Sequence, residues 1–438
     1  MSNGRYWRAY NGENDWNVAA NWSPHGVPGP KNHANIVAGD PVAFQVDVTT
    51  ADVASSLRFD APAATLFESA GGSLTISDAV FTAGTVVFNG DNNFKSLMIG
   101  NVALMFSSAS AFGTAAIDID PSLGEYGPPT GSVFEATADV VLDNAINAKY
   151  GTIIAAASGH TLELDGNVTV ADNAFIALNG RGAAGTVEIA DSWFGGSLVS
   201  VTVNGGFVTS GAGSKGDGAN ELFSDAVRVS LFGTLDVTNF AGISTTLHDL
   251  EKTGTVLNTG PSRTLTLQDA NYAGTFTGDF KLLVGGTSAF SGSGLDGRKL
   301  FMAPGTDHLD LTHATGTFEI VATAESTATA VVAPGAGQID HFFNFQQGRL
   351  TIDADVTARA KVTYADHPTF VTLTIHPGGG QPLEHLYFNG ISSHDNFAIG
   401  NDGAGHMQIA WSPSEEHAAA VESAAAAAGC VPAVHDGF

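Results

Sequence analysis

The fold is decided by the stretch Thr161-Leu162-Glu163-Leu164-Asp165-Gly166-Asn167-Val168-Thr169-Val170. Its two runs, 161–164 and 168–170, alternate apolar and polar residues with a period of two, which is typical of strands that bury one face. The Asp-Gly dipeptide between the runs is a turn signal. The stretch therefore predicts two short strands joined at a sharp corner.

The same unit recurs from about residue 70 to about residue 410. Other alternating runs are Leu74–Ile76, Thr85–Phe88, Thr186–Ile189, Val199–Val203, Val227–Val229, Leu235–Val237 and Thr264–Leu267. The turn dipeptides between such runs include Asn89-Gly90, Asn179-Gly180, Asn204-Gly205, Asp296-Gly297 and Asn389-Gly390. Because this region contains no long apolar pattern with a period of 3.6, we expect it to be nearly all β.

Three architectures could hold so many short strands. Tandem sandwiches would need linkers, and no Pro-rich or charged linker is present. A propeller would show aromatic signatures about every 40–50 residues, and these are absent. A β-helix stacks coils of roughly 20 residues and accepts Gly and Asn at its corners. We therefore predict an all-β fold, a right-handed parallel β-helix (β-solenoid) over residues 61–411.

The two ends of the chain differ from this pattern. Residues 1–60 contain Trp7, Trp16 and Trp22 among turn residues and predict a cap over the open end of the core. Residues 412–438 predict a short C-terminal helix, because an alanine run follows Ser414-Glu415-Glu416 and ends at Gly429. This tail adds little to a β core, so it is a candidate secretion signal.

Composition limits the partners of the chain. Only 14% of the 438 residues are charged and 43% are hydrophobic, which excludes a disordered chain. The net charge of −27 disfavours nucleic acid and anionic membranes as partners, and it suits divalent cations such as calcium. No run approaches 18 apolar residues, so no membrane span is expected. The single cysteine, Cys430, permits no internal disulfide.

One pair of acidic residues has a spacing that could serve catalysis. Asp118 and Asp120 would lie on one face of a strand, about 6.5–7 Å apart by the strand rise. That is near the separation of the two carboxylates in inverting glycoside hydrolases. A simpler interpretation is that Ile117 and Ile119 point inward while the aspartates are solvated. We therefore expect that the protein is not an enzyme, and Asp118 and Asp120 stay weak catalytic candidates.

Two other groups could bind a metal ion. Asp395 and Asp402, with nearby carbonyl groups, could hold calcium in a turn. His308 and Asp310 would share one strand face near His313 and could bind a transition metal, but a solvated polar face is the better interpretation of this group. The sequence contains no nucleophile elbow, phosphate loop or dinucleotide fingerprint.

Parts of the sequence resemble secreted bacterial solenoids. The segments Asp15-Trp16-Asn17 and Asn21-Trp22-Ser23, followed by Val27-Pro28 and a strand at Ile36, look like the start of autotransporter-type passenger domains. The segment 396–409 is similar to repeat units of secreted proteobacterial solenoids, and 339–345 is similar to strands of calcium-dependent, type I secreted (RTX-like) proteins. The glycine- and aspartate-rich calcium repeats of that class are missing. The resemblance implies a secreted, extracellular β-solenoid of the bacterial cell surface.

Two functions follow as expectations. The first is a structural or adhesive protein of the cell surface or biofilm matrix that self-assembles into filaments or arrays. Its cap, through Trp7, Trp16 and Trp22, would dock on an exposed strand at 407–411 of a neighbouring copy. The alternative is a β-helix that binds or degrades polysaccharide, such as a lyase, depolymerase or phage tailspike.

Overall fold

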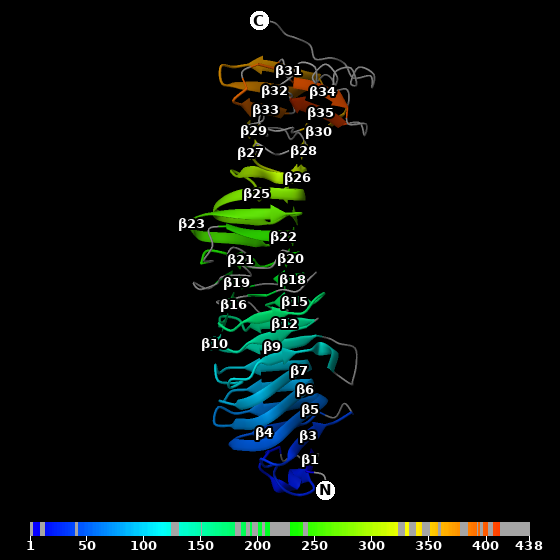
Figure 1. The fold of residues 1–438 in the computed structure, drawn as a ribbon, viewed down its shortest axis with the longest axis vertical. Coiled ribbons are helices and arrows are strands. Elements are labelled where there is room, and N and C mark those ends of the chain that lie inside the picture. The colour runs from blue at the N-terminus through cyan, green and yellow to red at the C-terminus, as the bar shows by residue number, and fades with distance from the viewer. Residues whose placement is uncertain are drawn as a thin grey trace. The chain divides into compact units, whose positions relative to one another are not determined.

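The computed structural model describes the chain except for the following residues: 1–2, 9–13, 40–42, 124–130, 150, 180–184, 190–192, 195–199, 204–205, 211–227, 240–243, 323–328, 333–338, 344–350, 358–360, 377–383, 392, 395–396, 402–405 and 412–438. In the described structure strands make up 67% and helical turns 2%, and they form a β-solenoid of about 11 turns (Figure 1). The all-β solenoid prediction is therefore confirmed. The predicted helix in 412–438 lies outside the described residues. The chain divides into two compact units, Met1–Ile243 and Ser244–Phe438.

The first unit begins with short strands and then three long ones. These are β1 (Gly4–Trp7), β2 (Trp22–Ser23), β3 (His33–Val37), β4 (Gln45–Val48), β5 (Ala51–Glu68), β6 (Ser73–Phe88) and β7 (Asn93–Phe106). β5, β6 and β7 pair side by side in parallel, and β7 passes on to both β8 (Ile117–Ile119) and β9 (Ser132–Ala136). Because β5 runs through residue 60, the boundary drawn there from the sequence falls inside a strand.

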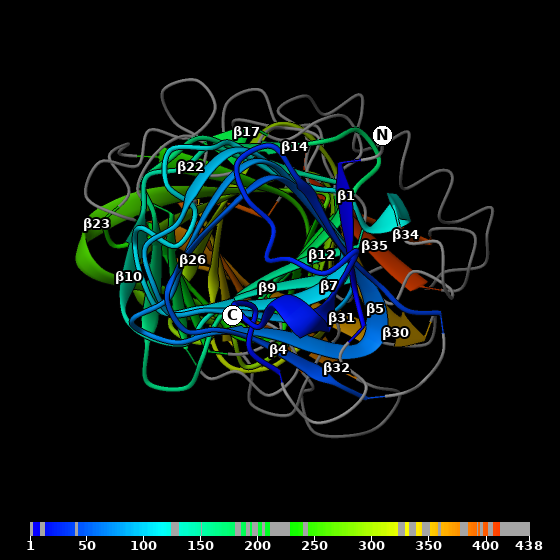
Figure 2. The ribbon, with the colours of Figure 1, turned by 90° about the horizontal axis from the view of Figure 1, so that it is seen from below.

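From β8 onward, the coils of the first unit build three parallel stacks. The remaining strands are β10 (Val140–Leu142), β11 (Ile146–Ala148), β12 (Thr152–Ala156), β13 (Thr161–Leu164), β14 (Val168–Val170), β15 (Phe175–Leu178), β16 (Thr186–Ile189), β17 (Trp193–Phe194), β18 (Ser200–Val203), β19 (Phe207–Ser210), β20 (Arg228–Leu231) and β21 (Thr234–Asp236). The stacks are β8–β11–β14–β17, β9–β12–β15–β18–β20 and β10–β13–β16–β19–β21. Seen end-on, the strands of this unit run around a closed outline (Figure 2).

Coil length is not constant along this unit. Ile76 lies beside Phe94 in an early coil, whereas Ile117 lies beside Ile146 in a later and longer one. The stretch 161–170 supplies β13 and β14, and the corner between them falls at Asp165-Gly166 as predicted. Inward-facing residues meet their equivalents one coil away, so the core of the early coils is a column of phenylalanine rings. Its buried members are Phe59, Phe81, Phe88, Phe94, Phe106, Phe112 and Phe134.

The second unit repeats the parallel design and then changes direction. Its strands are β22 (Ser244–Lys252), β23 (Thr255–Gln268), β24 (Asn271–Tyr272), β25 (Thr275–Gly292), β26 (Lys299–Ala314), β27 (Glu319–Ala322), β28 (Thr329–Val332), β29 (Ile339–Phe343), β30 (Thr351–Thr357), β31 (Lys361–Asp366), β32 (Phe370–His376), β33 (Glu384–Asn389), β34 (Phe397–Asn401) and β35 (His406–Trp411). Pairing is parallel from β22 to the β28–β30 and β29–β33 pairs.

The last strands depart from the parallel prediction. β31, β32 and β33 form an antiparallel meander, and β35 pairs antiparallel with β30 and with β34. Only the short segment 367–369 separates β31 from β32, and a connection that short cannot return the chain for parallel pairing. β35 is therefore paired along both edges. The expectation that 407–411 forms an exposed edge strand is wrong.

Candidate functional site

The candidate site predicted from the sequence lies on the outer face of β8. Ile117 and Ile119 are fully buried, so the alternation of the strand turns Asp118 and Asp120 outward onto one face, as expected. The neighbouring strand β11 brings Asn147 directly beside Asp118, and Lys149 follows at the end of the same strand. The turn η2 (Pro121–Leu123) adds Ser122.

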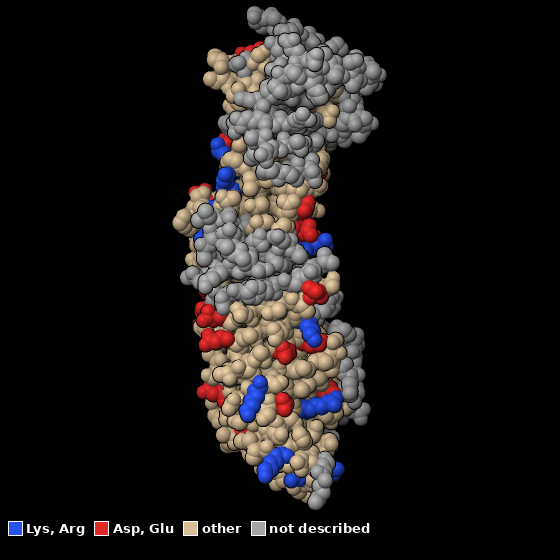
Figure 3. All heavy atoms as spheres, viewed as in Figure 1, with Lys and Arg blue, Asp and Glu red and all other residues tan. Residues whose placement is uncertain are grey.

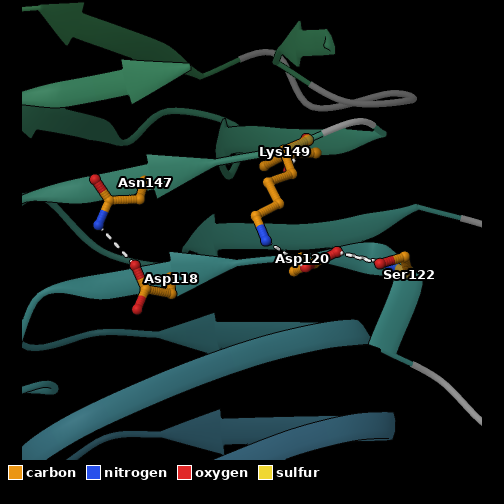
Figure 4. A network of polar contacts seen from close by, with 6 residues as sticks. Asp118, Asp120, Ser122, Asn147 and Lys149 are labelled. Atoms are coloured by element: carbon orange, nitrogen blue, oxygen red, sulfur yellow. Dashed lines mark hydrogen bonds and ion pairs between the residues drawn. The ribbon is translucent and has the colours of Figure 1, made fainter. Parts of the chain in front are cut away.

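Each aspartate has its own partner, and the two do not share one (Figure 4). The Asn147 amide donates a hydrogen bond of 2.6 Å to Asp118 Oδ1. Lys149 Nζ lies 2.6 Å from Asp120 Oδ2, and the Ser122 hydroxyl donates to Asp120 Oδ1 at 2.5 Å. The arrangement is a polar ladder between adjacent coils, and we call residues 118, 120, 122, 147 and 149 the β8 ladder.

The electrostatics of the β8 ladder favour the charged form of Asp120. Partial burial acts to raise the pKa of Asp120, but the hydrogen bonds from Lys149 and Ser122 outweigh it and hold the pKa below its ordinary value. An inverting hydrolase needs one carboxylic acid that keeps its proton near neutral pH. Asp120 does not meet that requirement, and its side chain is only 13% exposed, so the geometry supports a structural polar ladder.

Replacement of Asp120 by asparagine is expected to cost at most about 1 kcal/mol at pH 7, because the Lys149 side chain is 57% exposed and water screens the pair. A lowered pKa stabilises the fold above the ordinary aspartate pKa and loses that effect as the pH falls through the lowered value. The Asp120→Asn variant and the wild type should therefore converge in stability as the pH falls through that lowered pKa. Urea unfolding at pH 7 and at a series of acidic pH values checks this, with Asp118→Asn as the control. A loss above about 2 kcal/mol at pH 7 would contradict it.

Two buried carboxyl groups with a raised pKa were missed by the sequence analysis. Glu68, at the end of β5, is fully buried, and burial raises its pKa to about 7. Asp52 is 5% exposed, and burial raises its pKa to about 6 against the hydrogen bond from Asn17. The phase of the strand could have revealed Glu68, because it comes two positions after the buried Leu66 and so points inward.

The three cap tryptophans form a buried cluster. Trp16 and Trp22 are fully buried and Trp7 is 5% exposed. The Trp22 ring packs edge-on against both others, at centroid distances of 5.0 Å to Trp7 and 4.8 Å to Trp16, and its indole N–H donates to the Trp16 carbonyl oxygen. β1 carries this cluster onto the solenoid by pairing in parallel with β3. Of the two roles considered, this burial supports a plug of the chain's own core.

The predicted metal ligands are described only in part. Asp395 and Asp402 lie outside the described residues. His308 and Asp310 share the outer face of β26 as predicted, but the Asp310 carboxylate accepts hydrogen bonds from the backbone and the hydroxyl of Thr312. Within the described ranges, no three His, Cys, Asp or Glu residues are grouped as metal ligands. Calcium binding stays a prediction.

Charged side chains are sparse on one described face of the Met1–Ile243 unit. Figure 3 shows isolated acidic and basic side chains there, with broad uncharged areas between them. Glu163 and Glu188 lie side by side on β13 and β16, and burial together with the Glu163 charge raises the pKa of Glu188. Among the described residues, no helix is long and apolar enough to cross a membrane.

Comparison with known proteins finds no relative of this chain. No protein-family model matches the chain, and no curated protein or solved structure is significantly similar to it.

Proposed function

We propose that the protein is a secreted structural or adhesive component of the bacterial cell surface or biofilm matrix that binds other copies of itself. The observation that supports this most is the register of the outer face. Outward residues such as Asp118 and Asn147 lie in line from coil to coil, at the strand spacing of about 4.8 Å. A face built this way presents a long, regular and weakly charged surface, which suits extended or repeated partners.

The cap and the last strands bear on how copies would join. At the N-terminal end, β1 is paired on both edges, by the short strand β2 and by β3. In the other unit, β35 is paired on both edges as well. Short or fully paired end strands blunt the edges that would otherwise add another chain. Self-association is therefore proposed to use the sides of the solenoid, with the tryptophan cluster stabilising the fold. Export through the 412–438 tail and calcium binding belong to the same proposal.

Purified full-length protein should form filaments or arrays in negative-stain images, and its light-scattering mass should rise with concentration. The physical reason is that repeated weak contacts along a regular face add up when two solenoids align. A particle that stays monomeric at every concentration tested, and that does not bind to bacterial cells, would contradict the proposal.

A second function has one observation in its favour. The β8 ladder places carboxylate, amide and ammonium groups at regular spacing, and such groups hydrogen-bond sugar hydroxyls. A polysaccharide-binding solenoid would use them, and the double variant Asn147→Ala, Lys149→Ala would then bind a surface polysaccharide more weakly. The double variant Glu163→Gln, Glu188→Gln, on a different stack, is the matched control. Equal binding by both variants would remove the β8 ladder from this function.

A further inference from the structure

The corner between β5 and β6 contains a buried carboxyl group in an unusual setting. Glu68 Oε2 accepts a hydrogen bond of 2.8 Å from the Asn92 amide. The same amide donates to the Ala111 carbonyl oxygen, and Asn92 Oδ1 accepts from the Leu74 N–H at 2.6 Å. Asn92 therefore ties together three successive coils, and its link to the first of them is the Glu68 carboxyl group.

The other oxygen of Glu68, Oε1, is buried without a well-formed hydrogen bond in the described structure. The Gly90 N–H acts to lower the pKa of this carboxyl group, but burial outweighs it. A Cβ placed on Gly90 would collide both with Glu68 Oε1 and with the carbonyl oxygen of Gly72, so both oxygens are packed against Gly90. A charged carboxylate oxygen that is buried without a hydrogen-bond donor carries a desolvation penalty. A proton on Oε1 relieves that penalty, because it turns the oxygen into an O–H donor for which the Gly72 carbonyl oxygen is a nearby candidate acceptor.

The charges around the corner act in the same direction as burial. The charged neighbour of Glu68 is Asp91, on the turn between β6 and β7, and its negative charge adds to burial in raising the pKa of Glu68 to about 7. The turns packed on either side contribute neutral groups: Ser69 N–H donates to the Val48 carbonyl oxygen, and the Asn89 amide donates to the Glu68 carbonyl oxygen. The carboxylate therefore has no cation to balance it among the described groups at this corner.

We propose that Glu68 is a proton-controlled latch, in which the neutral acid closes the corner between β5 and β6 through the Gly72 carbonyl and the carboxylate loosens it. The direction follows from linkage. Because the folded state holds the proton more tightly than the open state, the latch stabilises the corner at acidic pH. That stabilisation is lost as the pH rises through about 7. The proposal is independent of the assembly proposed above.

Amide hydrogen exchange measured at pH 5.5 and pH 8.5, corrected for the chemical exchange rate, tests the latch. The reporters are the N–H groups of Leu74 and Asn92. The references are those of Asp165 and Gly166, which donate to the Leu142 carbonyl oxygen at the corner between β13 and β14. The pKa of Glu68 is about 7 in the folded state, against an ordinary value of 4.5 in the open state. Protection of the reporters should therefore fall about 30-fold between pH 5.5 and pH 8.5. The references should change less than about threefold.

Two variants separate the latch from general effects of pH. Glu68→Gln should remove the pH dependence at the reporters, whereas Glu163→Gln, which replaces an outward carboxylate on β13, should keep it. Asp52, another buried carboxyl group, accepts a hydrogen bond from the Asn17 amide and is unchanged in both variants, so its contribution stays in both. Equal loss of protection at reporters and references in the wild type would overturn the proposal even if Glu68→Gln failed to fold. A folded Glu68→Gln variant in which reporter protection kept its pH dependence would also overturn the proposal.

Discussion

Replacement of Trp22 by alanine is expected to lower the free energy of unfolding of the N-terminal coils by about 3–5 kcal/mol. Trp22 is the central ring of the cap cluster, so its loss leaves Trp7 and Trp16 facing a cavity and removes the hydrogen bond to the Trp16 carbonyl oxygen. Solenoid coils depend mainly on their neighbours, so the damage should start at this end. Denaturant unfolding monitored by circular dichroism measures the loss of stability, and limited proteolysis of the segment from β1 to β5 shows where it begins.

Trp22→Phe is the matched control for this prediction. It keeps an aromatic ring against both neighbours but loses the indole N–H, and it should cost about 1–2 kcal/mol. The same pair of variants also separates the two roles of the cap. A tryptophan cluster that docked on another chain would lose assembly while the monomer kept its stability. Loss of stability, with assembly retained among folded molecules, is the result that the burial of these rings predicts.

Replacement of Phe106 by alanine is expected to have a similar effect deeper in the first unit, about 3–5 kcal/mol. Phe106 is fully buried, and its ring centroid lies 5.0 Å from that of Phe112 and 4.6 Å from that of Phe134. These rings belong to neighbouring coils, so truncation opens a cavity between coils and weakens their stacking. Denaturant midpoints measured for Phe106→Ala and for Phe106→Leu check the prediction.

The leucine variant fills most of the space and should cost about 1–1.5 kcal/mol. Phe175→Ala is a second control, because Phe175 on β15 is 38% exposed and should contribute less than about 0.5 kcal/mol. Equal losses for Phe106→Ala and Phe175→Ala would mean that the phenylalanine column does not stabilise the stack.

Much of the fold could be predicted because period-two alternation and turn dipeptides report directly on strands and corners. Val168 and Val170 are buried and Thr169 is exposed, as their alternation predicted. Alternation has no direction, however, so it could not distinguish the antiparallel β31–β33 meander from another parallel coil. Whether two strands pair parallel or antiparallel depends on the length of the connection between them and on which strands become neighbours in the fold.

The candidate site was predicted only in part, for a related reason. The sequence placed Asp118 and Asp120 on one face, but their partners lie on the next coil, where Asn147 sits directly beside Asp118. Coil length varies, so no fixed spacing pointed to Asn147 or Lys149. Glu68 was missed for a different reason. A glutamate at the end of a strand is usually solvated, so the inward phase of this position was passed over, and the close approach of Gly72 and Gly90 that completes its burial gives no signal in the sequence.

The stacking of coils in the first unit also determines how the chain would respond to mechanical force. The hydrogen bonds between coils point along the stacking direction, so tension applied at the N-terminus loads one coil at a time. Val140 lies beside Leu162 on the next coil, so each coil of this kind would release about 70 Å of extended chain as it detaches. A solenoid built this way would lengthen in steps under tension and keep its remaining coils folded.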